Sequence, residues 1–199
     1  MTTTRKCKTL SVQYLTRIAV LTALASILFL ISIPVVAFYH LDLSNVPVLL
    51  GAFSMGPLPG LVILFLKSLI GCLKSTTMYV GELADFIMGA AFVLPAAWIY
   101  RRQKNRKGAL IGMMVGTIGL IVVGCLTNLY MMIPFYMNAF GMPMQSIIDM
   151  CAKALPFVDS EWKVIAFVTA PFNLLKGVVL CVLTYLIYKP LSPLLHVRK

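Results

Sequence analysis

The chain has 199 residues, of which 60% are hydrophobic and only 12% are charged, and its formal net charge is +11. Because soluble domains contain about 45–50% apolar residues, this composition excludes an ordinary soluble domain and indicates an integral membrane protein in contact with the lipid bilayer. In such a protein the excess positive charge is expected in cytoplasmic loops rather than on a surface that binds nucleic acid.

The first predicted transmembrane helix follows a basic N-terminal segment, MTTTRKCKTL, and covers about residues 10–38. Its apolar run, Ile18–Phe38, is longer than the roughly 7–15 apolar residues of a secretory signal peptide and lacks an evident cleavage site, so we expect the helix to be retained. Within it, Ala19 and Ala23 lie four residues apart, which allows another helix to approach closely. On spacing alone, this face suits internal packing and docking of a partner equally well.

The next apolar segment, Val46–Leu73, is interrupted by the sequence GPLPG. A single crossing would place the basic loop Arg101–Lys107 outside the cell, whereas an even number of crossings keeps it inside. We therefore predict two short helices over about residues 45–56 and 60–74, although a re-entrant hairpin has the same parity. At a rise of about 1.5 Å per residue, the first of them is too short to cross the bilayer alone and must be shielded by protein.

Three longer helices complete the prediction, over about residues 81–103, 108–137 and 162–189. Basic residues at both chain ends are expected on the cytoplasmic side. The sequence thus predicts an all-α membrane protein of one domain, residues 1–199, built as a six-transmembrane-helix bundle with both termini cytoplasmic. The outer connection over residues 137–163 is long enough to act as a lid, and a surface-lying helix without a gating role explains it equally well.

A pair of polar residues lies inside the last predicted helix, at Asn173 and Lys176. Positions three apart share one helix face, and ionisable groups at membrane depth tend to mark functional sites. An amide offers a donor and an acceptor and an ammonium offers three donors, so the pair suits a ligand edge rich in carbonyl oxygens. Asn128, in the outer half of the fifth predicted helix, can join them. The alternative is a buried polar network that serves only structure.

Other polar and aromatic residues allow two interpretations. Glu82 and Asp85 open the fourth predicted helix, where they can stabilise the helix N-terminus, bind the hydroxyls of a ligand or pair with Lys176. Lys67 is expected to snorkel or to neutralise an acid. Aromatic residues near the outer ends of the helices, among them Tyr39, suit an interfacial belt or stacking on a flat ligand.

Several sequence motifs are absent. There is no GxxxxGK[ST] motif, no HExxH motif and no Ser/His/Asp grouping, and the five cysteines are scattered without a CxxC pair. We therefore expect neither an enzyme nor a metal site. A stand-alone secondary carrier remains an alternative, although such carriers often show internal repeats, and we find none here.

Five stretches together resemble a known family. In chain order they are AVLTA, LDLSNVPVLLGAFSMGPLPGLVILFLKSLI, VGELADFIMG, TNLYMMIPFY and PFNLLKG. Their order and spacing are similar to those of the substrate-binding S component of energy-coupling factor (ECF) vitamin transporters, of the riboflavin-binding type, over most of the length.

The resemblance implies a function and partners. Such a protein captures riboflavin at the outer face of the bacterial plasma membrane, as a transported ligand and not as a cofactor. It then docks on a transmembrane coupling subunit that is driven by two ATPase subunits. The small residues Ala19 and Ala23 resemble the docking surface for the coupling subunit. An S component for another vitamin, such as pantothenate or folate, is the alternative.

The resemblance also implies a flavin site near the outer surface. Asn45 stands where the family pattern has an acid, and Asp85 stands where it has an amide; the extra charge of Asp85 either disfavours a phosphorylated flavin or balances Lys176. The candidate binding residues come from the first outer loop and from the later helices: Tyr39, Asp42, Leu43, Glu82, Asp85, Asn128, Asn173 and Lys176.

Overall fold

The computed structural model describes residues 12–36, 39–75 and 77–195 of the chain, and side chains as far as residue 187. Phe38, at the end of the first apolar run, lies outside the described residues. So do the basic residues before residue 12 and Arg198 and Lys199, on which the predicted cytoplasmic location of the termini depends.

The described residues are mostly helical, and five helical stretches are long and apolar enough to cross a membrane. Two of these stretches contain a π-helical segment, η2 (Asn128–Met132) or η3 (Ile165–Thr169), and a short 3-10 helix, η1 (Cys72–Lys74), extends a third. The α-helices are α1 (Val12–Leu30), α2 (Asn45–Met55), α3 (Pro57–Gly71), α4 (Val80–Arg102), α5 (Arg106–Thr127), α6 (Ile133–Ala139), α7 (Met144–Ala152), α8 (Glu161–Val164) and α9 (Ala170–Leu195).

The first helix ends earlier than predicted. Instead of continuing to residue 38, α1 stops at Leu30, and Ile33–Val36 (β1) pairs antiparallel with Tyr39–Leu41 (β2) in a hairpin. Pro34 has no N–H to donate within a helix and disfavours helical geometry in the preceding residue. The β-branched residues around it favour a strand. Hydrophobicity alone did not distinguish this strand from a helix, so the predicted helix was too long.

The interrupted apolar segment forms α2 and α3, which meet at Gly56. Gly56 has a φ of 108°, a conformation that glycine adopts without steric cost. Pro57 then occupies the first turn of α3, where its missing N–H leaves no hydrogen bond unmade. Nearly all of α2 is buried among its neighbours, which provides the protein shielding expected for a helix of only 11 residues.

The helices α4 and α5 are packed backbone to backbone. A Cβ atom added at Gly112, Gly116 or Gly119 of α5 would lie 2.4 to 2.6 Å from a carbonyl oxygen of α4. The glycines therefore allow the two helices to approach closely, in the way that small residues do in membrane bundles. Fully buried side chains such as Phe92 and Leu120 continue the core next to this contact.

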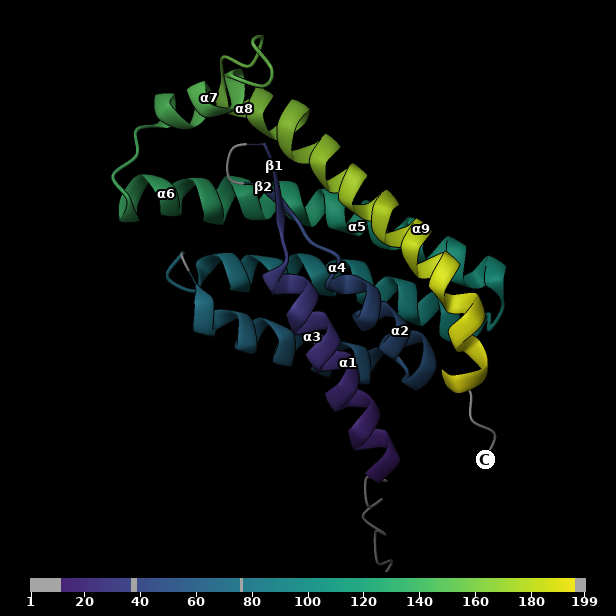
Figure 1. Cartoon of the computed structure of the whole chain (residues 1–199). Helices are drawn as coiled ribbons and strands as arrows, with labels where there is room; N and C mark the ends of the chain where they lie inside the picture. Colours follow the sequence, from purple (N-terminus) through teal and green to yellow (C-terminus); the bar gives the residue numbers. More distant parts are fainter. Residues whose placement is uncertain (1–11, 37–38, 76, 196–199) are drawn as a thin grey trace, which may run out of the picture.

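The hairpin and the long connection gather at one end of the molecule. In Figure 1, α7 and α8 lie at the end opposite the C-terminal end of α9. Tyr39 of β2 shares a buried apolar cluster with Ile148 and Cys151 of α7 and with Val168 of η3. Part of the connection over residues 137–163 is therefore helical and packed on the hairpin; its action as a lid stays a prediction.

Candidate functional site

A cavity of about 420 Å³ lies beneath the hairpin. Its walls come from the ends of α1 and α3, the beginnings of α4 and α9, and the η2 and α6 segments. Six of the eight binding residues expected from the sequence line it, although they come from separate parts of the chain: Tyr39, Asp42, Glu82, Asp85, Asn128 and Lys176.

Four charged side chains, three of them buried and Asp85 half-buried, form a network beside the cavity. The Lys176 ammonium donates to Asp42 Oδ2 at 2.8 Å and to Asp85 Oδ1 at 3.5 Å. The Lys67 ammonium donates to the other Asp85 oxygen at 2.6 Å and lies 4.8 Å from the centre of the Phe29 ring. Lys67 is 0% exposed, and both Asp42 and Lys176 are 4% exposed. Two cations and two carboxylates thus balance each other away from bulk water.

The turn after the hairpin holds Asp42 in place. Its Oδ1 atom accepts hydrogen bonds from the Ser44 backbone N–H at 3.0 Å and from the Ser44 hydroxyl. Lys67 in turn donates to the Ser44 hydroxyl oxygen at 2.9 Å. Burial by itself would raise the pKa of the Asp42 carboxyl, but the charges of Lys176 and Lys67 and these hydrogen bonds hold it well below its ordinary value. Asp42 is therefore ionised at neutral pH.

These contacts show which partner each charged residue has. The interpretation of Lys67 as the partner of an acid is confirmed by its bond to Asp85. Lys176 is also paired, as in the structural alternative, but with Asp42 and Asp85, and it lines a cavity at the same time. Glu82 takes another role, since it accepts hydrogen bonds from two hydroxyl groups of the preceding loop, Ser75 at 2.8 Å and Thr77 at 3.4 Å.

The two asparagines are placed differently. Asn128, in η2, lines the cavity and donates from its amide to the Gly124 carbonyl at 2.9 Å. Asn173 does not line the cavity. It is 0% exposed, donates to the Thr169 carbonyl at 3.0 Å and packs so closely on Gly124 that a Cβ there would lie 2.5 Å from its amide nitrogen. Its side-chain oxygen has no hydrogen-bond partner among the described residues.

Tyr39 and Leu43, on either side of Asp42, have different surroundings. The Tyr39 hydroxyl is 2.5 Å from the Thr169 hydroxyl, and its ring centre is 5.1 Å from that of Phe172, so Tyr39 fastens the hairpin to the last membrane helix. Burial raises the pKa of the Tyr39 hydroxyl above its ordinary value, so this group stays protonated. Leu43 is half-buried beside Asp42 and is not part of the cavity lining.

Sequence reasoning missed several lining residues. Met132 and Tyr136 follow Asn128 at intervals of four residues and line the cavity with it. Likewise, Met88 lies three residues beyond Asp85. Residues three or four positions apart share one helix face. Counting three or four residues onward from Asp85 and Asn128 would therefore have identified these three lining residues.

The small residues of α1 face outward. Ala19 and Ala23 are both exposed, whereas Ile18, Thr22 and Ala25 are buried against the bundle. The alternative of an internal packing face is therefore wrong for this pair. The outward face remains available for a partner helix or for lipid.

Comparison with known proteins gives consistent results. The family model described as "ECF transporter, substrate-specific component" matches residues 13–188. The chain is 31% identical over 179 residues to "Riboflavin transporter RibU" of Staphylococcus aureus (strain TCH60), with 88% of each chain covered. It is 27% identical over 192 residues to "Riboflavin transporter FmnP" of Bacillus subtilis (strain 168), covering 92% of this chain and 94% of that protein. A solved structure described as "Structure and mechanism of the S component of a bacterial ECF transporter" superposes with a TM-score of 0.72 at 29% identity, covering 93% of this chain and 98% of the other.

Proposed function

Because the chain belongs to the family of ECF transporter substrate-specific components, and is thus a multi-pass membrane protein and a transporter component, we propose that it binds riboflavin in the cavity beneath the hairpin. The relatives named as riboflavin transporters support this ligand. Riboflavin is then cargo and not a cofactor.

The observation that carries the proposal is the balanced charge of the cavity wall. Riboflavin is a neutral, flat tricycle with an imide edge and a chain of hydroxyls. An ammonium has three N–H donors, and the described partners of Lys176 account for two of them. The third N–H and the Asn128 amide suit the carbonyl oxygens and ring nitrogens of the imide edge. A vitamin with a carboxylate, such as pantothenate or folate, favours a cation free of other anions, whereas Lys176 is already paired with Asp42 and Asp85.

The rest of the cavity suits the flavin ring. Its volume of about 420 Å³ lies within the roughly 300–1,000 Å³ of small-molecule sites. Phe172, Tyr136, Met88 and Met132 supply aromatic and thioether surface for stacking and apolar contact. Asp85 balances Lys176 and Lys67, which accounts for an acid where the family pattern has an amide.

The orientation follows from the distribution of charge. Tyr14 near the beginning of α1 and Lys104 after α4 line one cavity, so these two ends lie together. The basic residues around Lys104 support a cytoplasmic location for this end. The riboflavin cavity contains the opposite ends of α1 and α4 and therefore faces outward. We propose six membrane-inserted helices, with α2 as the short one, and both termini cytoplasmic.

Transport requires partners in this proposal. The exposed face with Ala19 and Ala23 docks on the transmembrane coupling subunit, and two ATPase subunits supply the energy. The family match supports this assembly in general, and the outward position of the two alanines supports the surface.

Titration of the purified protein with riboflavin tests the ligand. Quenching of flavin fluorescence is expected without ATP or partner subunits, and pantothenate and folate are expected not to compete. No quenching at micromolar riboflavin would refute the proposal. Riboflavin uptake into vesicles that contain this chain alone would instead favour a stand-alone carrier.

A further inference from the structure

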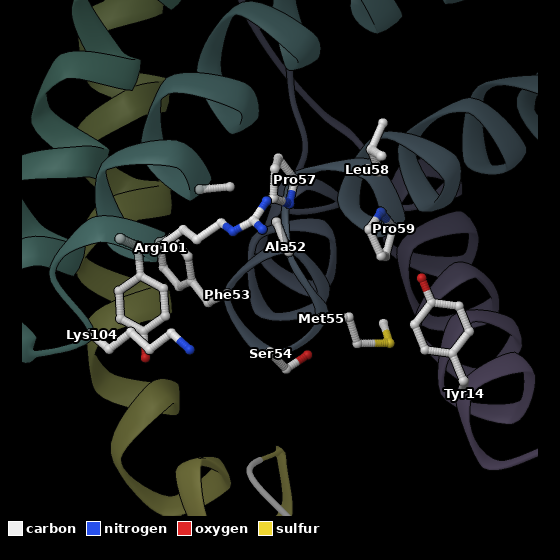
Figure 2. A pocket seen from close by; sticks show the side chains of 13 residues that line it. Tyr14, Ala52, Phe53, Ser54, Met55, Pro57, Leu58, Pro59, Arg101 and Lys104 are labelled. Carbon is white, nitrogen blue, oxygen red and sulfur yellow. The ribbon is translucent and has the colours of Figure 1, made fainter. Parts of the chain in front are cut away.

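A second cavity, of about 360 Å³, lies at the other end of the bundle, between α1, α2, α3 and the end of α4. Figure 2 shows Tyr14 of α1 on one side and Arg101 and Lys104 on the other, with Ser54 and Met55 of α2 between them. It shares no lining residue with the riboflavin cavity.

The charge of this cavity is positive. Arg101 and Lys104 line it, and no aspartate or glutamate does. Neither residue belongs to an ion pair among the described side chains. The N-terminus of α3 also borders the cavity through Gly56, Pro57 and nearby residues, and a helix N-terminus adds partial positive charge. In Figure 2 the Arg101 guanidinium points in the direction of Pro57.

One edge of the cavity continues into an apolar helix face. Leu58 lines the cavity and is 74% exposed. Val62, Phe65 and Leu69 follow it at intervals of three and four residues along α3, and all three are large exposed hydrophobic side chains. Such a face on a membrane helix is expected to contact acyl chains.

A neighbouring residue pair indicates the depth of the cavity in the membrane. Trp98 of α4 is 55% exposed, and the Arg102 guanidinium lies 4.1 Å from the centre of its ring. Exposed tryptophans next to basic residues are typical of the boundary between headgroups and acyl chains. Arg101 and Lys104 belong to the same end of α4, so the cavity lies at the level of the headgroups.

We propose that this cavity binds the phosphate of an anionic phospholipid headgroup, with the acyl chains along the outer face of α3. Arg101 and Lys104 pair with the phosphate, as basic pockets between membrane helices do. The hydroxyls of Tyr14 and Ser54 are placed at the same cavity to bind polar headgroup atoms. A phospholipid would contact both features, with its headgroup in the charged cavity and its acyl chains on the adjoining apolar face. A protein partner does not require these two surfaces to be continuous.

The test measures which lipid the purified full chain retains. The protein is taken from vesicles that contain equal amounts of phosphatidylglycerol and phosphatidylcholine, and the bound lipid is identified by native mass spectrometry. Wild-type protein is expected to retain phosphatidylglycerol preferentially. Because one direct hydrogen bond contributes about 1 kcal/mol, loss of both phosphate contacts in Arg101→Gln with Lys104→Gln is expected to lower this preference roughly 30-fold. Each single substitution is expected to lower it roughly fivefold, so the result does not depend on the double variant.

Arg102→Gln is the matched control, because Arg102 is a neighbouring basic residue that does not line the cavity. It is expected to leave the preference almost unchanged. An equal loss in the control, or no loss in the double variant, would overturn the proposal. Displacement of phosphatidylglycerol by millimolar inorganic phosphate would assign the cavity to free phosphate. Unchanged lipid retention with lost binding of the coupling subunit would assign it to a protein partner. Either outcome would overturn the lipid assignment, and neither depends on riboflavin.

Discussion

Replacement of Lys176 by methionine separates its two roles, as a structural ion and as a contact for the ligand. The substitution keeps an unbranched side chain of similar length and removes a charge held 2.8 Å from Asp42 and 3.5 Å from Asp85. Removal of one partner from a buried ion pair costs about 3–5 kcal/mol, because a buried charge is left uncompensated. Asp85 retains Lys67 at 2.6 Å, so the loss falls mainly on Asp42, and we expect the lower end of that range.

A second substitution, Asp42→Asn, removes the charge that Lys176→Met leaves behind. The double variant is therefore expected to be more stable than the sum of the single changes indicates, with a coupling free energy of about 2 kcal/mol. Riboflavin affinity is expected to behave differently. If Lys176 donates a hydrogen bond to the flavin, the double variant loses about 1.5–3 kcal/mol of binding free energy, which is roughly 10- to 150-fold in affinity.

The assays are chemical unfolding in detergent for stability and quenching of flavin fluorescence for affinity. Lys163→Met is the control, because Lys163 pairs with Asp159 at 2.6 Å in an exposed position and does not line the cavity, and we expect it to change neither quantity measurably. A double variant that regains stability and binds riboflavin as wild type does would show that Lys176 is structural only. Additive losses in stability would refute the pairing of Lys176 with Asp42.

Four further predictions concern the cavity, the exposed face of α1, the α4–α5 contact and Asp42. Asn128→Ala is expected to weaken riboflavin binding by about 1 kcal/mol, roughly fivefold by fluorescence titration, because its amide lines the cavity; unchanged affinity would remove it from the site. Ala23→Trp is expected to preserve binding and abolish vitamin uptake in cells, and persistent uptake would contradict the docking surface. Gly116→Ala is expected to lower the free energy of unfolding by about 1–3 kcal/mol, because the new Cβ would lie 2.4 Å from the Phe92 carbonyl oxygen; a neutral result would mean that α4 and α5 separate easily. The stability advantage of wild type over Asp42→Asn is expected to be present above about pH 4 and to disappear as the pH falls through the lowered folded-state pKa of Asp42; an advantage that grows in acid would have the wrong sign.

The sequence predicted the features that depend on local pattern. Apolar length and the positions of basic loops indicated the helices, and the short α2 followed from the parity of crossings and its interrupting glycines and prolines. The strand at Ile33–Val36 was missed because a short apolar strand has the same apolar content as the end of a membrane helix. Pro34 was the available signal, since it disfavours continuation of the helix.

The sequence predicted most of the residues that line the candidate site, but not which residues pair with one another. Spacing of three residues placed Asn173 and Lys176 on one helix face, but a helix face is wide, and only Lys176 reaches the cavity. The partner of Lys176 is Asp42, 134 residues earlier in the chain, and no local pattern connects positions so distant. Lys67 was correctly interpreted as the partner of an acid, yet its role in holding the turn through Ser44 depends on tertiary contacts.

The balanced network of Lys67, Lys176, Asp42 and Asp85 also bears on how a neutral ligand arrives. Opposite charges this close together project little field into the surrounding water, so they provide little long-range steering. Capture of riboflavin should then proceed at nearly the same association rate in dilute and concentrated salt, with selection left to the fit inside the cavity.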